Sequence, residues 1–123
     1  MQVRELYHGT NGDNILDIIH YGVLRPNADG KVFFSEWRFD SVLMHGADLR
    51  RKASFALKLS VTIPPTASVR QESTHGVLDT LVVTTAIPLP VEVLALYVRE
   101  PWASTVQTVV GTPHITAYLV SRG

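Results

Sequence analysis

The stretch VRELYHGTNGD, residues 3–13, decides how the chain starts to fold. Its first part, from Val3 to Tyr7, has the composition of a short strand, and the Asn-Gly-Asp at its end supplies turn and helix-capping chemistry. We therefore expect a helix directly after it. Apolar residues recur there at helical spacing, and Gly22 is placed to end the helix in the left-handed conformation. These apolar residues are Ile15, Leu16, Ile18 and Ile19.

The next segments show loop, strand and helix signals in turn. Residues 23–30 contain proline, asparagine and glycine and indicate a loop, whereas residues 31–35 are β-branched and aromatic and predict a strand. A second helix is expected over residues 40–51, with Asp40 as its cap. The basic run at its C-terminal end, Arg50, Arg51 and Lys52, suits the negative end of that helix, although it could instead bind phosphate.

From Ala53 onward the apolar pattern has a period of two. Phe55, Leu57, Leu59 and Val61 alternate with small or polar residues, which predicts a half-buried strand. Further strands are expected over residues 67–70, 80–85, 91–98, 105–110 and 114–120. Two helices followed by many strands, without a low-complexity linker or a repeat, indicate a single α+β domain over residues 1–123.

Composition narrows the class of protein. The 123 residues carry 11 basic and 11 acidic side chains, so no net field draws the protein to nucleic acid or to an anionic membrane. The lack of cysteine excludes thiolate metal sites, disulfides and a cysteine nucleophile. The N-terminus has no signal-peptide pattern, and no window approaches the ~20 apolar residues that span a bilayer. We expect a cytoplasmic protein without a membrane partner, with a secreted effector still open.

The common motifs of nucleotide binding and acyl transfer are missing from the sequence. It contains no P-loop, no GxGxxG turn and no GxSxG elbow, so any nucleotide must be held in another way. The histidines include no pair at helical spacing, and no metal site is expected. His20 and His45 are interpreted as partly exposed helix residues.

The segment Tyr7-His8-Gly9-Thr10 is the most informative for chemistry. A glycine after a histidine at a strand end lets a ligand approach the backbone, although a histidine in an ordinary turn fits the same residues. The wider order is more specific: His8-Gly9-Thr10, then Gly22-Val23, then Phe33-Phe34-Ser35, with Ser41 on the following helix. In this order the first part of the chain resembles the ADP-ribosyltransferase superfamily. The resemblance is to the branch that includes the poly(ADP-ribose) polymerases, the rifampicin-modifying transferases and the RNA 2′-phosphotransferases.

The resemblance implies a split β-sheet core with two N-terminal helices, and NAD as the substrate. On this mapping His8 hydrogen-bonds the adenosine ribose, the backbone of Gly9 pairs with the nicotinamide carboxamide, and Ser41 adds a bond to that amide. Phe33 lines the nicotinamide pocket, where a flat, electron-poor pyridinium gains from aromatic contact. The residues expected to bind NAD are His8, Gly9, Thr10, Phe33, Phe34, Ser35, Ser41 and Met44.

Two positions depart from the family pattern. Met44 stands where the polymerases stack a second aromatic ring, and a thioether does not replace that stacking face. The third family motif is a glutamate that opens a strand before an Ile-Pro turn, and the best register places Thr80 there, beside Asp79. A carboxylate matters because positive charge develops on the ribose as nicotinamide leaves. The expected catalytic residues are therefore His8, Asp79 and Thr80. Glu72 is a weaker candidate for the acid. Asp79 is explained equally well as a solvent-exposed residue of a turn.

The leading hypothesis is a NAD-dependent ADP-ribosyltransferase, a glycosyltransferase that releases nicotinamide and modifies an unknown protein, nucleic acid or small molecule. The alternative is a catalytically inactive domain of the same fold that binds NAD, another nucleotide or a protein partner. Transfer of an RNA 2′-phosphate to NAD ranks below both, because the arginines of the first half are scattered. Among them Arg25 is best placed to meet a pyrophosphate, or it is simply a solvated loop residue.

Overall fold

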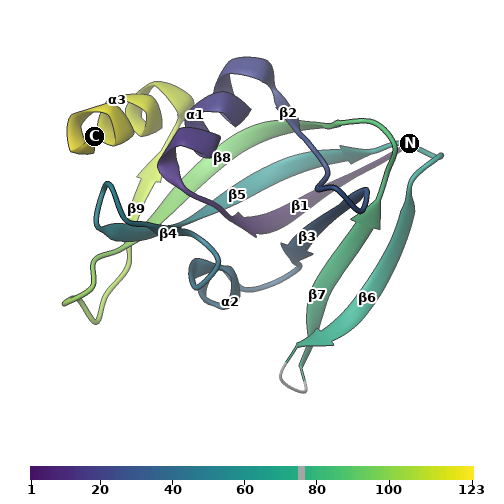
Figure 1. The fold of residues 1–123 in the computed structure, drawn as a ribbon, viewed down its shortest axis with the longest axis horizontal. Coiled ribbons are helices and arrows are strands. Elements are labelled where there is room, and N and C mark those ends of the chain that lie inside the picture. The colour runs from purple at the N-terminus through teal and green to yellow at the C-terminus, as the bar shows by residue number, and fades with distance from the viewer. Residues whose placement is uncertain (75–76) are drawn as a thin grey trace.

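The computed structural model describes the backbone of residues 1–74 and 77–123, and all side chains except those of residues 73–79. Within these residues the chain is an α+β fold whose strand pairs are antiparallel (Figure 1). The helices are α1 (Gly12–Tyr21), α2 (Asp40–Leu43) and α3 (Thr112–Arg122). The strands are β1 (Gln2–Gly9), β2 (Val23–Leu24), β3 (Lys31–Ser35), β4 (Ala47–Asp48), β5 (Ala53–Ile63), β6 (Ser68–Thr74), β7 (Val77–Thr84), β8 (Leu89–Arg99) and β9 (Gln107–Val110). No helix in the described ranges is long and apolar enough to cross a membrane.

The strands form one sheet that divides into two well-paired parts. Their order is β2-β8-β5-β1-β3-β7-β6, with β4 added to β5 and β9 added to β8. Strand β1 pairs with β5 along its whole length but shares only the register pair Tyr7↔Ser35 with β3. Strand β3 then pairs with β7 along all five of its residues. The sheet is therefore continuous in pairing, but β1 and β3 meet only at Tyr7 and Ser35 and diverge beyond that pair.

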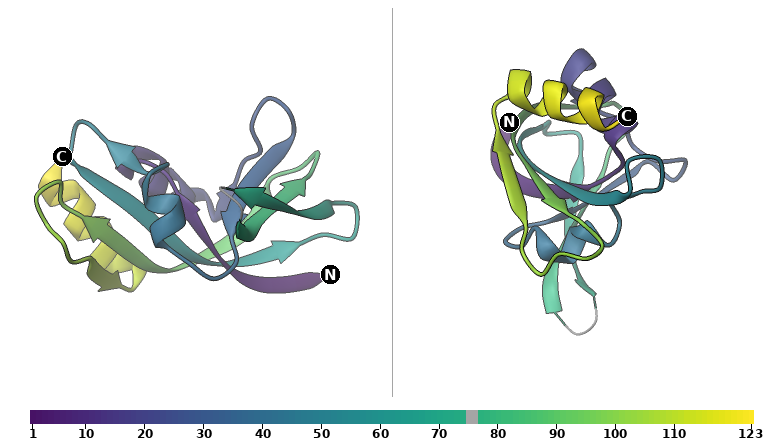
Figure 2. Two further views of the ribbon diagram at one scale, coloured as in Figure 1. Left: turned by 90° about the horizontal axis from the view of Figure 1, so that it is seen from below. Right: turned by 90° about the vertical axis from the view of Figure 1, so that its left-hand side faces the viewer.

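The hydrophobic core lies between one face of the sheet and two helices. Helices α1 and α3 lie side by side on this face (Figure 2). On the opposite face, α2 packs Val42 and Leu43 against Ala56. The prediction for β5 is confirmed, because its four expected inward-facing residues are fully buried. These are Phe55, Leu57, Leu59 and Val61.

The first elements form as their sequence predicts. Asn11 caps α1 by accepting a hydrogen bond of 2.9 Å from the Asn14 amide, and Gly22 ends the helix with a φ of 68°. Strand β3 has the expected bounds. His20 is an exposed residue of α1, but the exposed His45 lies in the turn after α2 and not in a helix.

The predicted second helix is wrong in its extent, because α2 ends at Leu43 and does not reach residue 51. Residues 47–54 form a tight hairpin in which β4 pairs with the start of β5. Arg51 does not serve a helix end; it turns inward, pairs with Asp48 and Asp13, and donates to the backbone carbonyl of Leu119. A buried guanidinium with all these partners favours the hairpin over the weak helical preference of this segment.

The predicted last strand, residues 114–120, is also wrong, since these residues belong to α3. Pro113 lies in the first turn of that helix, where its missing N–H costs nothing. Ile115 and Leu119, one helical turn apart, are fully buried. The β-branched residues of this segment favour a strand locally, but burial of one helical stripe against the sheet outweighs that preference.

Candidate functional site

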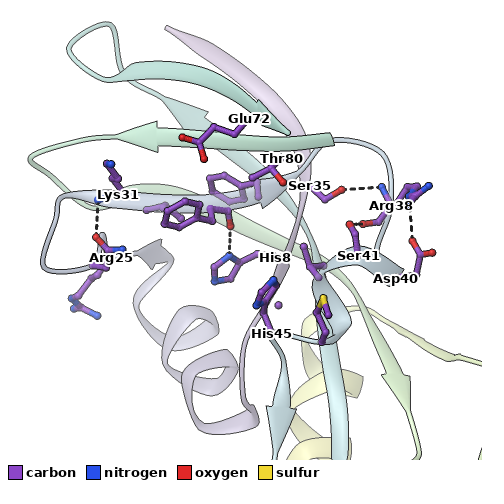
Figure 3. A pocket seen from close by; sticks show the side chains of 17 residues that line it. His8, Arg25, Lys31, Ser35, Arg38, Asp40, Ser41, His45, Glu72 and Thr80 are labelled. Atoms are coloured by element: carbon purple, nitrogen blue, oxygen red, sulfur yellow. Dashed lines mark hydrogen bonds and ion pairs between the residues drawn. The ribbon is translucent and has the colours of Figure 1, made fainter. Parts of the chain in front are cut away.

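A cavity of about 830 Å³ opens where β1 and β3 diverge (Figure 3). It is lined by the end of β1, the loop before β3, β3 itself, α2 with the turn after it, and the β6–β7 pair. All five residues of β3 contribute to the lining, since β1 pairs with this strand only at Ser35. Most of the expected site residues line this one cavity: His8, Gly9, Phe33, Phe34, Ser35, Ser41, Met44 and Thr80.

His8 sits at the end of β1 and forms a hydrogen bond across the divergence. Its Nδ1 atom lies 2.8 Å from the carbonyl oxygen of Phe33. Since a carbonyl oxygen only accepts, Nδ1 carries the proton and donates it. Burial lowers the pKa of His8; the hydrogen bond to Phe33 opposes this effect and nearby His45 adds to it. The ring is therefore neutral at pH 7, and its Nε2 atom is a hydrogen-bond acceptor.

Gly9 is required by packing as well as by its place in the cavity. A Cβ atom on this residue would lie 1.9 Å from the carbonyl oxygen of Val42, so α2 rests directly on the end of β1. The sequence interpretation, in which glycine keeps the backbone open to a ligand, is thus incomplete. The backbone that approaches Gly9 most closely is that of α2.

The expected nicotinamide-pocket residues lie along β3 and α2. Phe33 is 45% exposed and Met44 is 65% exposed, and both line the cavity. Ser35 is buried and its hydroxyl oxygen accepts from the Arg38 amide, 3.2 Å away. Ser41 donates to the Arg38 carbonyl oxygen at 3.1 Å. The two serines thus hold the loop between β3 and α2 from both sides.

Thr10 lies in a second, smaller hollow of about 360 Å³. This hollow shares His8 and Arg25 with the main cavity, so it lies next to it. The Thr10 hydroxyl oxygen accepts from the side-chain amide of Asn14 at 3.0 Å. Thr10 therefore lies outside the main cavity, in the neighbouring hollow that His8 also lines.

The residues considered for the catalytic acid lie on β6 and β7. Asp79 belongs to β7, but its side chain is outside the described residues. Thr80 lines the cavity, and its register partner on β6 is Glu72, which lines the cavity too. Figure 3 shows Glu72 and Thr80 on one side of the cavity, with His8 and His45 on the other. Glu72 also forms an ion pair with Arg70.

Cationic side chains lie at two ends of the cavity. Arg25 and Lys31 line one end, and Arg38 lines the other, 3.7 Å from the carboxylate of Asp40 (Figure 3). The sequence reasoning did not select Lys31 or Arg38 for the site. The strand pattern could have indicated Lys31 as a site residue, because alternate residues of a strand share a face and Lys31 therefore lies on the same face as Phe33 and Ser35. Arg38 lies in a loop, for which no periodicity gives a signal.

The lining of the cavity is mixed, with aromatic, cationic and acidic side chains. Among the side chains that the structure describes, no three from histidine, cysteine, aspartate and glutamate gather closely enough to hold a metal. The lining combines an aromatic ring, a neutral imidazole and separated cations. No protein-family model, curated protein or solved structure matches the chain.

Proposed function

We propose that this protein binds NAD in the cavity between β1 and β3 and transfers its ADP-ribose to an acceptor, with release of nicotinamide. One observation carries the proposal: His8 and Phe33, 25 residues apart in the chain, line the same cavity and are joined through the Phe33 carbonyl. The resemblance in the sequence implies this pairing of motifs. The divergence of β1 from β3 accords with the split sheet that the same resemblance implies.

The chemistry of the lining supports a pyridine dinucleotide. The volume of about 830 Å³ falls within the usual range of sites for small molecules and cofactors. The neutral His8 offers Nε2 as an acceptor for a ribose hydroxyl. The ring of Phe33 offers a face to the nicotinamide, and Arg25 with Lys31 offers charge to the pyrophosphate.

Calorimetry with purified protein tests the binding step. We expect NAD to bind more tightly than NADH, because only the oxidised ring is a cation that gains from Phe33. His8→Ala should weaken NAD binding roughly 3- to 10-fold, the equivalent of a hydrogen bond of ~0.5–1.5 kcal/mol. His20→Ala, an exposed change on α1, is the matched control and should leave binding unchanged. Equal binding by the wild type and by His8→Ala would contradict the proposed site.

Mass spectrometry tests the transfer. Protein incubated with NAD and a cell lysate should yield free nicotinamide and an acceptor carrying ADP-ribose. The same experiment decides the alternative, an inactive NAD-binding domain, which is favoured by Thr80 at the third motif and by the exposed Met44. Binding of NAD without release of nicotinamide would establish that alternative.

A further inference from the structure

We infer that the carboxylate which stabilises the reacting ribose comes from Glu72 on the neighbouring strand β6, and not from β7. This inference rests on the proposed function, since it assigns a residue to that reaction. It arises from the position of Thr80, where the third motif of the family would carry the acid. Register places Ser35, Thr80 and Glu72 in one row across β3, β7 and β6.

Residues in such a row project from the same face of the sheet. Directly opposed residues on antiparallel strands have Cβ atoms ~4.5–5.5 Å apart, so the longer glutamate side chain can reach the space in front of threonine. Both Glu72 and Thr80 line the cavity that also contains His8. The short side chain at position 80 leaves room there for a carboxylate from the next strand.

A catalytic carboxylate also needs a fixed backbone, and β6 is the edge strand of the sheet. The neighbouring residue Gln71 provides a tether, because its side-chain amide donates to the carboxylate of Glu36. Glu36 has a side chain only 8% exposed and is also paired with Arg4 of β1. The contacts among Arg4, Glu36 and Gln71 thus tie β6 to β1 across the divergence. Gln71 and Glu72 face opposite sides, so this tether leaves Glu72 directed to the cavity.

The reaction step assigned to Glu72 is as follows. The bond between C1′ of the ribose and the nicotinamide nitrogen breaks, and its electron pair leaves with nicotinamide, which becomes neutral. The Glu72 carboxylate stabilises the positive charge on the ribose. A lone pair of the acceptor then forms the new bond to C1′, and the acceptor's proton passes to Glu72 and on to water.

The ordinary explanation of Glu72 is a surface ion pair with Arg70. Two variants separate the explanations: Glu72→Gln and Arg70→Ala both remove the ion pair, but only the first removes the carboxylate. We would measure NAD affinity by calorimetry and nicotinamide release with water and with a whole-cell lysate as acceptor. Thermal melting checks that each variant is folded.

We expect Glu72→Gln to bind NAD within about 3-fold of the wild type and to lower the rate of nicotinamide release by ~10²–10³. Arg70→Ala should keep the rate within about 3-fold, and Asp79→Asn, at the acid that the sequence favours, should lower the rate far less than Glu72→Gln does. Loss of activity in Asp79→Asn with normal activity in Glu72→Gln would overturn the assignment and leave the proposed function standing. A wild type that binds NAD without turnover overturns it in favour of the inactive domain. A wild type that neither binds nor cleaves NAD overturns both proposals.

Discussion

Replacement of Asp48 by alanine tests the reasoning about the hairpin that displaced the predicted helix. The Asp48 and Arg51 side chains are 4% and 2% exposed, and their charged atoms lie 3.1 Å apart. The Asp48 carboxylate also accepts from the backbone amides of Gly12 at 2.7 Å and Arg51 at 2.9 Å. It therefore joins the start of α1 to the hairpin, while Arg51 continues the connection to α3 through Leu119.

Removal of one partner from a buried ion pair costs ~3–5 kcal/mol, because the remaining charge loses its compensation. Here Arg51 keeps Asp13, 3.0 Å away, so the lower end of that range applies. A loss of ~3 kcal/mol in a domain of this size lowers the Tm by roughly 10 °C. Thermal unfolding followed by circular dichroism measures it, with Asp29→Ala in the exposed loop before β3 as the control.

The same carboxylate predicts how stability depends on pH. Burial by itself raises the pKa of Asp48, but the hydrogen bonds from the Arg51 and Gly12 amides and the guanidinium of Arg51 outweigh it, and the net shift is downward from 3.8. A group with a lowered pKa in the folded state stabilises the fold above its unfolded pKa. Its contribution is therefore complete above pH ~4 and falls as the pH drops further. An Asp48→Ala variant with the Tm and acid sensitivity of the wild type would refute the ion-pair reasoning.

Three other predictions concern the cavity and its walls. The pKa of His8 is lowered from 6.5, and the neutral ring is the form that accepts at Nε2. NAD affinity should therefore stay constant from pH 8 to 6.5 and decline only below that range. Calorimetry in buffers across this range measures it. Gly9→Ala should destabilise the fold by ~1–3 kcal/mol, because the new methyl group collides with the Val42 carbonyl. Urea unfolding measures this change. An unchanged unfolding midpoint would contradict the close contact between β1 and α2. Glu36→Gln removes the charge that pairs with Arg4 and so weakens the tie between β6 and β1. It should lower the kcat of nicotinamide release several-fold with little effect on KM. A change in KM alone would contradict the role of Glu36 in positioning β6.

Some of the site could be predicted because its motifs are local. The end of β1, the cap at Asn11, the left-handed Gly22 and the strand of Phe33 each depend on neighbours within a few residues. Their order along the chain led to His8 and Phe33 as a pair, and the structure places both at one cavity.

The acid could not be placed by the same means. The position on β7 that matches the third motif of the superfamily the sequence resembles is Thr80, which is not an acid. The sequence offers Glu72 only as a weaker candidate, and the pairing of β6 with β7 is what brings it opposite Thr80. Register between strands depends on a turn and on long-range packing, neither of which a sequence motif encodes.

The sequence by itself determined the α+β class, the first strand and helix, the alternating strand β5 and the residues around His8. Local propensity and periodicity are enough for these features, because each depends on side chains close together in the chain. Only the tertiary structure decided that residues 47–54 form a hairpin, that residues 112–122 form a helix, and that β1 and β3 diverge to open a cavity. These outcomes depend on contacts between residues far apart in the chain, such as Arg51 with Leu119 and Tyr7 with Ser35. The energy of such contacts exceeds the local helix and strand preferences that a sequence displays.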